Sequence, residues 1–166
     1  MSKRIRQYLG ILGAIAAYYA VHEGAHYAVA RYFGVFRQIN ILGLGLQIDV
    51  YAERMTETQL GIFCLAGAVA ACAAGWLLIL SAGSICKAGS SLFRAAMWYV
   101  TLALLMVDPI YLSLLCGFFG GGDMNGISLL FPETAARLVF GGIGVIHIAV
   151  IVKYLLPVYK ASFRDH

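Results

Sequence analysis

The stretch 8–30, YLGILGAIAAYYAVHEGAHYAVA, joins an apolar run of membrane-spanning length to a cluster of polar side chains. The hydrocarbon core of a bilayer requires about 20 consecutive, mostly apolar residues of helix. A basic segment precedes the run, as in a signal peptide, but a cleavable signal would remove the polar cluster together with the run. We therefore expect residues 8–30 to form a retained first transmembrane helix.

The polar cluster is the pentapeptide His22-Glu23-Gly24-Ala25-His26, an H-E-x-x-H motif. On a helix, residues i and i+4 share a face, so His22 and His26 can bind one ion while Glu23 reaches a water molecule on it. A charged group in the middle of a membrane helix costs about 2.5 to 3.5 kcal/mol, and such groups tend to mark function. The alternative, a chance match between packing residues, does not explain why these three polar side chains occur together in one helical turn. The motif indicates a zinc metalloprotease with two histidine ligands, a general base and an open coordination position.

Composition places this motif in a membrane protein. Of the 166 residues, 61% are hydrophobic and 12% are charged, and the mean hydropathy is +0.83. We expect one membrane-embedded metalloprotease domain over residues 1–166. The net charge of +4 comes without a basic stripe or base-stacking motif, which favours contact with the lipid bilayer over nucleic-acid binding. The four cysteines form no C-x-x-C pair and are expected to be packing residues.

The predicted fold class is all-α integral membrane, with about four transmembrane helices. Apolar runs predict these helices at about 8–30, 59–82, 93–119 and 135–156. In the second run, Gly67, Ala71 and Gly75 recur every four residues, which predicts a small-residue face that packs against the first helix. His147, alone in the last run, is interpreted as a hydrogen-bonded packing residue.

Between the first two helices the hydrophobic period changes to two. Large apolar residues alternate with glycine and polar residues from Leu42 to Val50, which predicts a small membrane-associated β strand or hairpin at about 39–51. A glycine-containing surface loop is the alternative. If the strand lies beside the active site, it can hold an extended substrate by strand addition, and the residues proposed for this are Gly43, Leu44, Gly45 and Leu46.

Two aspartates are candidates for the third metal ligand. Asp108 precedes a proline within the third apolar run, and Asp123 follows that run in a glycine-rich segment, 120–126. The first and third helices cross the membrane in the same direction, so Asp123 emerges on the same side as the two histidines. An unwound segment can fold inward, which favours Asp123. Asp108 is the alternative, either as ligand or in a substrate-orienting or structural role.

Three separated pieces of the chain resemble the site-2-protease family of intramembrane zinc metalloproteases. The pentapeptide with its continuation to residue 35 resembles the family's H-E-x-G-H helix and its exit. Residues 65–67 resemble the Ala-Gly-Pro opening of the next core helix, although Ala68 stands in place of the proline. Residues 122–123, with Gly126, resemble the Asp-Gly element that provides the family's third zinc ligand, but its usual Asn-x-x-Pro approach is absent.

The resemblance implies a three-helix catalytic core, Zn²⁺ as the metal, a membrane-associated strand near the site, and transmembrane or membrane-bound peptides as substrates. Glu23 would take a proton from the attacking water and pass it to the leaving amine. The competing function is a catalytically inactive membrane zinc-binding protein: a sensor, a carrier or a relative that holds a partner. Intact Glu23 favours the enzyme, because a binding site alone needs no base.

Basic residues predict the orientation of this multi-pass protein in a cell membrane. One predicted side carries Lys3, Arg4, Arg6, Lys87, Arg94, Lys153, Lys160 and Arg164, and the other carries Arg31, Arg37, Arg54 and Arg137. The positive-inside rule then predicts cytoplasmic termini and an active site that opens toward the outer face. The resemblance implies the opposite opening, since sites of that family usually face the cytosol.

Overall fold

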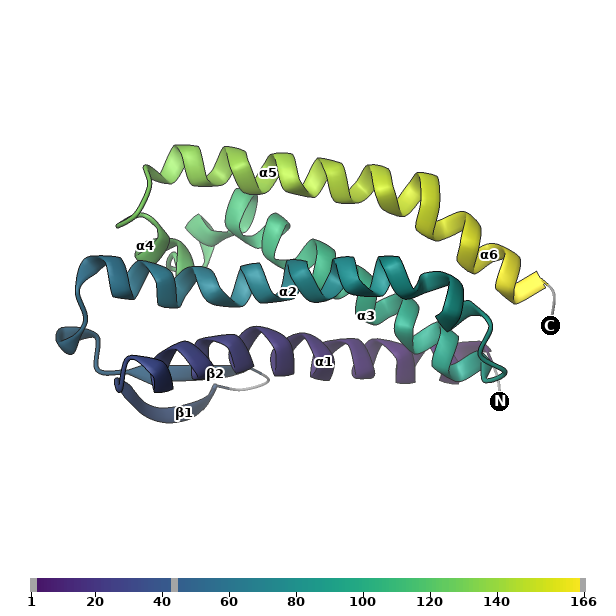
Figure 1. Cartoon of the computed structure of the whole chain (residues 1–166), viewed down its shortest axis with the longest axis horizontal. Coiled ribbons are helices and arrows are strands. Elements are labelled where there is room, and N and C mark those ends of the chain that lie inside the picture. Colours follow the sequence, from purple (N-terminus) through teal and green to yellow (C-terminus); the bar gives the residue numbers. More distant parts are fainter. Residues whose placement is uncertain (1–2, 43–44, 165–166) are drawn as a thin grey trace.

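The computed structural model describes residues 3–42 and 45–164 as a mostly helical chain with one two-stranded antiparallel sheet. The elements in chain order are α1 (Lys3–Tyr32), β1 (Phe36–Leu42), β2 (Gly45–Val50), the short η1 (Ala52–Arg54), α2 (Glu57–Cys86), α3 (Ser91–Ile110), η2 (Tyr111–Leu115), η3 (Cys116–Phe118), α4 (Asp123–Ile127), α5 (Glu133–Val150), η4 (Ile151–Leu155) and α6 (Leu156–Arg164). The long helices lie side by side, and the hairpin lies at the end opposite both termini (Figure 1). The predicted helical fold with a hairpin after the first helix is confirmed.

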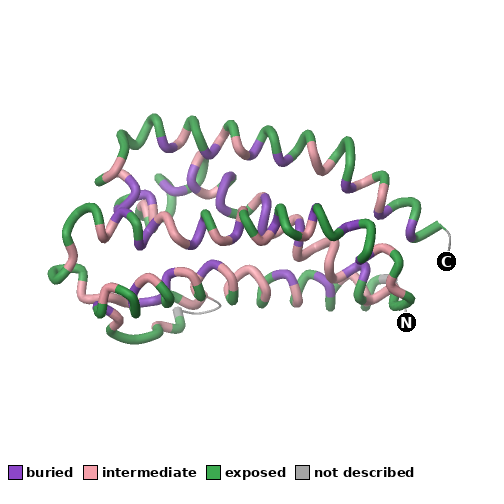
Figure 2. Tube along the Cα trace, viewed as in Figure 1, coloured by how far each residue is buried: buried purple, intermediate pink, exposed green. Residues whose placement is uncertain are grey.

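Within the described residues, three helical stretches are long and apolar enough to cross a membrane. They are Glu57–Cys86, Ser91–Phe118 and Glu133–Arg164, with mean hydropathies of 2.3, 1.9 and 2.1. The polar pentapeptide lowers the hydropathy of α1, which is as long as α2. Exposed positions recur along the long helices (Figure 2). Many of them are large apolar residues, including Leu80 at 77% exposure and Leu138 at 72%. Soluble proteins rarely expose contiguous apolar surface, so this pattern suggests association with a membrane.

Two glycines of α2 allow close packing against two different helices. A Cβ atom at Gly67 would meet the rings of His22 and His26 on α1, and one at Gly75 would meet Leu105 on α3. The small-residue face therefore packs on α3 as well as on α1, and the prediction that named α1 alone is incomplete. A capping box at Thr56 starts the helix two residues before the predicted boundary.

Pro109 shapes the centre of the bundle. Because proline has no backbone N–H, the carbonyl of Leu105 lacks its usual helical partner. The Nδ1 atom of His147 donates to that carbonyl oxygen over 2.6 Å, and the Nε2 atom accepts a hydrogen bond from the Trp76 indole over 3.1 Å. His147 thus joins α5 to α3 and α2, as its interpretation as a hydrogen-bonded packing residue anticipated.

The long predicted helices differ from the observed ones at their ends. Instead of one helix over 93–119, α3 ends at Ile110 and continues as the π-helical η2 and then η3. A widened turn after a proline is a usual response to the lost backbone hydrogen bond. The last helix extends beyond the predicted 156, through η4 and α6 to Arg164.

The hairpin pairs β1 with β2 in an antiparallel register that includes Ile39 with Ile48 and Leu42 with Gly45. The first strand begins at Phe36, before the predicted boundary at residue 39. Ile48 is buried against the bundle, so β2 is the strand that faces the helices. Gly43 and Leu44, two of the four residues proposed to bind substrate, lie outside the described residues.

Candidate metal centre

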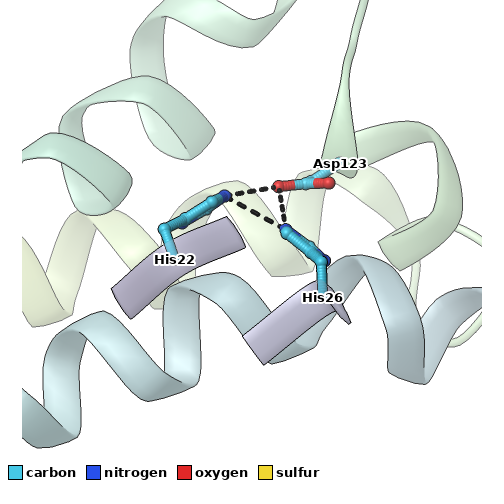
Figure 3. A group of neighbouring side chains, drawn as sticks. All are labelled: His22, His26 and Asp123. Atoms are coloured by element: carbon cyan, nitrogen blue, oxygen red, sulfur yellow. Dashed lines mark hydrogen bonds and ion pairs between the residues drawn. The ribbon is translucent and has the colours of Figure 1, made fainter. Parts of the chain in front are cut away.

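His22, His26 and Asp123 meet where α1, α2 and the start of α4 converge. Their ligand atoms all lie within 4.8 Å of one another (Figure 3). The Nε2 atoms of His22 and His26 are 3.1 Å apart. The Oδ2 atom of Asp123 lies 3.3 Å from Nε2 of His22 and 3.4 Å from Nε2 of His26. Both rings are buried, with 7% exposure for His22 and 3% for His26.

The opposite nitrogen of each ring fixes its tautomer. Nδ1 of His26 lies 2.8 Å from the carbonyl oxygen of Phe63. A carbonyl oxygen only accepts, so this nitrogen carries the proton. Nδ1 of His22 lies 3.2 Å from the Asp108 carboxylate, which likewise accepts. When the rings are neutral, their Nε2 atoms carry lone pairs, which is the form that ligates metals.

In that form, three acceptor atoms face one another. Two imidazole lone pairs and a carboxylate oxygen repel at these distances unless a cation lies among them. A tetrahedral zinc ion with bonds of about 2.0 to 2.1 Å places its ligand atoms about 3.3 Å apart. The observed separations of 3.1, 3.3 and 3.4 Å match that spacing. The three residues thus fit a metal ion in both chemistry and size.

Asp123 reaches this point through the glycine-rich turn that follows η3. Gly120, Gly121 and Gly122 have φ values of +77°, +87° and +49°, a region that other residues rarely adopt. The turn directs the chain inward and starts α4 at Asp123. Asp123 thereby brings a carboxylate oxygen to 3.3 and 3.4 Å from the Nε2 atoms of His22 and His26.

Asp108, the alternative candidate, lies on the other side of His22. Its carboxylate contacts Nδ1 of that ring, not the Nε2 side, and accepts a hydrogen bond from the Tyr18 hydroxyl over 2.6 Å. At 1% exposure it is almost fully buried on α3. A carboxylate behind a metal-binding histidine holds the ring orientation and increases its basicity. Its geometry fits a supporting role and not that of a third ligand.

Glu23 faces the hairpin. Its Oε2 atom accepts a hydrogen bond from the backbone N–H of Ile48 over 3.1 Å. Glu23, His26 and Asp123 line a cavity of about 300 Å³, together with residues 45–48 of β2. A second cavity of about 470 Å³ opens between α1 and α3 and is also lined by Glu23 and Asp123. Glu23 thus borders two cavities.

Three features that support the site were missed in the sequence. Gly67 was interpreted as a packing residue, yet a Cβ atom there would lie 2.5 Å from Nε2 of His26 and 2.7 Å from Nε2 of His22. Tyr18 lies four residues before His22, so helical spacing could have identified it as a neighbour. The carbonyl of Phe63 is a backbone group and gives no signal in the sequence.

No protein-family model matches the chain, and no match was found among curated proteins or solved structures. The geometry of the site therefore stands as the basis for a function.

Proposed function

We propose that this protein is an intramembrane zinc metalloprotease of the site-2-protease type, which hydrolyses peptide bonds of transmembrane or membrane-associated substrates. The observation that carries the proposal is the triangle of acceptor atoms from His22, His26 and Asp123 with the carboxylate of Glu23 beside it. A purely structural cluster would place donors between these acceptors. A purely metal-binding site would have no use for a carboxylate that borders the same cavity.

His22, His26 and Asp123 would hold the zinc ion, and Asp108 and the Phe63 carbonyl hold the two rings in the ligating tautomer. When bound, zinc polarises the substrate carbonyl and makes water a competent nucleophile at neutral pH. Asp123 carries one negative charge and the two imidazoles are neutral, so a doubly charged zinc ion in the site would leave a net positive charge. That charge stabilises the oxyanion that develops on the substrate.

Glu23 would act as general base and then as general acid. It follows His22 directly on α1, so the backbone fixes its place relative to the ligands. The hydrogen bond from the Ile48 N–H occupies one carboxylate oxygen and leaves the other for the proton of the attacking water. Glu23 then delivers this proton to the leaving amine.

Strand β2 would receive the substrate as an additional strand. The Ile48 N–H donates to Glu23 and therefore points away from β1. Backbone groups of alternate residues along this edge of β2 point the same way, toward the cavity. Gly45 and Leu46 lie on the same stretch of β2 and line the cavity. A peptide that pairs with this edge is extended, as hydrolysis requires, and its scissile carbonyl lies beside Glu23.

We propose a membrane topology from the distribution of charge. We place α1 as a fourth spanning helix, because it is 30 residues long and packs along α2 and α3. Both termini and the turn between α2 and α3 lie at one end of the bundle, and the metal centre lies toward the other (Figure 1). The end with the termini carries most of the basic residues, so we place it in the cytoplasm and the site toward the outer face.

The test is cleavage of a panel of fluorogenic transmembrane peptides by purified wild type, Glu23→Gln and Glu53→Gln in detergent, with zinc measured on the same samples. Glu53 is an exposed carboxylate on η1 and serves as the matched control. We expect Glu23→Gln to keep about one zinc ion per chain and to lose activity by about a thousandfold. The control should resemble wild type.

Two results would overturn the proposal in different ways. An active Glu23→Gln variant would remove the assigned base. Zinc bound to a wild type that cleaves no peptide of the panel would favour the inactive zinc-binding protein.

A further inference from the structure

A further cavity, separate from the two beside Glu23, lies at the end of the bundle that carries the termini. It has a volume of about 660 Å³ and lies between the N-terminal parts of α1 and α3 and the end of α6. Its lining residues are Arg6, Gln7, Gly89, Ser91, Arg94, Ala95, Trp98, Tyr99 and Phe163. None of these takes part in the metal centre, so the cavity has no role in the proposed protease.

Arg94 is a buried cation with incomplete hydrogen bonding. Its side chain is 1% exposed; its Nη1 atom donates to the carbonyl of Ala88 over 2.6 Å, and its Nε atom has no hydrogen-bond partner. A buried guanidinium normally pairs with a carboxylate, because an uncompensated buried charge is costly. No such partner is present among residues 3–42 and 45–164. The cavity beside Arg94 is where an anion would satisfy it.

A second cation converges on the same place. The guanidinium carbons of Arg6 and Arg94 lie 5.6 and 5.4 Å from the centre of the Phe163 ring. No acidic side chain lines the cavity within the described part of the chain. Ser91 begins α3, whose N-terminus adds a partial positive charge. Two arginines and a helix N-terminus around one cavity form a positive site with no acidic side chain among the described residues that line it.

We propose that this cavity binds a phosphate-bearing anion, the headgroup of an anionic phospholipid. The planar guanidinium groups of Arg6 and Arg94 match the geometry of phosphate oxygens. Trp98 and Tyr99 line the cavity, and such residues concentrate at the level of lipid headgroups. The cavity lies at the end that charge places in the cytoplasm, where the leaflet is rich in anionic lipid. This site does not depend on the protease activity.

The experiment is calorimetric titration of the purified chain in neutral detergent with short-chain phosphatidylglycerol, phosphatidylcholine and inorganic phosphate. A salt concentration of 0.5 M screens attraction between exposed charges, leaving contacts within the cavity. The variants are Arg94→Gln, Arg6→Gln and the matched control Arg4→Gln. Arg4 lies on the same helix and carries the same charge, but it is exposed and does not line the cavity. Arg6 is only partly buried, so its variant remains informative if Arg94→Gln fails to fold.

We expect phosphatidylglycerol to bind more tightly than phosphatidylcholine, with affinity about tenfold lower in Arg6→Gln and Arg94→Gln and unchanged in Arg4→Gln. Inorganic phosphate that binds as tightly as phosphatidylglycerol, with the same dependence on Arg6, would support the phosphate site and assign it to a soluble ligand. Equal affinities for Arg6→Gln and Arg4→Gln, or no binding of either anion, would overturn the proposal.

Discussion

The histidines of α1 and the histidine of α5 are all buried, yet their hydrogen bonding differs. In His147, Nδ1 donates to the carbonyl of Leu105 and Nε2 accepts from Trp76, so both ring nitrogens have complementary partners. In His22 and His26, Nδ1 also meets an acceptor, but the two Nε2 atoms face each other and the Asp123 carboxylate. Protein groups satisfy both nitrogens of the α5 ring, whereas the α1 pair and Asp123 are placed so that they could hold a metal ion.

This contrast separates a histidine that protein groups satisfy from a pair that is placed to hold a metal ion. Burial does not separate them, since His147 is 2% exposed and His26 is 3% exposed. What separates them is whether the second nitrogen finds a donor. We therefore expect changes at the α1 pair to affect zinc binding, and changes at His147 to affect stability alone.

The largest expected effect comes from Gly67→Ala. The added methyl group would displace both histidine rings, at a cost of about 3 kcal/mol or more than about a hundredfold in zinc affinity. Gly83→Ala on the same helix is the matched control, because nothing lies within 4 Å of the added atom. Competition with a zinc chelator measures both affinities. Equal zinc affinities for Gly67→Ala and Gly83→Ala would mean that α2 does not pack closely against the two histidine rings.

His147→Leu should destabilise the fold and leave zinc in place. The substitution strands the Leu105 carbonyl and the Trp76 indole N–H in an apolar interior, which costs about 2 kcal/mol. Denaturation in mixed micelles gives the loss of stability, and elemental analysis of the folded fraction gives the zinc content. A folded His147→Leu protein that had lost its zinc would contradict the assignment of His147 to structure alone.

Asp108→Asn should weaken zinc binding by about tenfold, or 1.4 kcal/mol, while preserving the fold. The amide keeps the shape but removes the charge that holds Nδ1 of His22. Asp49→Asn is the control, since Asp49 pairs with Arg37 on the hairpin, away from the metal ligands. Abolished rather than weakened binding would make Asp108 a ligand.

The smallest expected effect is that of Trp76→Phe. It removes a single hydrogen bond, to Nε2 of His147, and should cost about 1 kcal/mol of stability with no change in zinc. The same denaturation assay measures it. A cost above that of His147→Leu would show that packing of the indole ring, and not its hydrogen bond, holds α5.

Much of this arrangement could be predicted from local sequence. Helical spacing places His22, Glu23 and His26 in one turn, and counting the passages across the bundle brings Asp123 to the same end. The hairpin follows from the two-residue period that ends at Val50. These predictions depend on periodicity and chain direction, which a sequence displays directly.

Other features depend on tertiary contacts that no local pattern encodes. The path of α3 places Asp108 beside Nδ1 of His22, while Asp123 lies beside Nε2 of the same ring. The spacing of the two aspartates along the chain does not reveal which nitrogen each one contacts. His147 replaces a backbone donor lost at Pro109, a pairing between residues on separate helices. The small-residue face at Gly67 was visible, but its contact with two imidazole rings was not.

The most direct test of the central claim is the metal content of wild type and Asp123→Ala, purified in detergent, exposed to zinc and measured by elemental analysis. The account predicts about one zinc ion per chain in wild type and nearly none in Asp123→Ala, because two neutral imidazoles alone bind zinc weakly. A wild type that takes up no zinc, or an Asp123→Ala variant that binds it as tightly as wild type, would contradict the account.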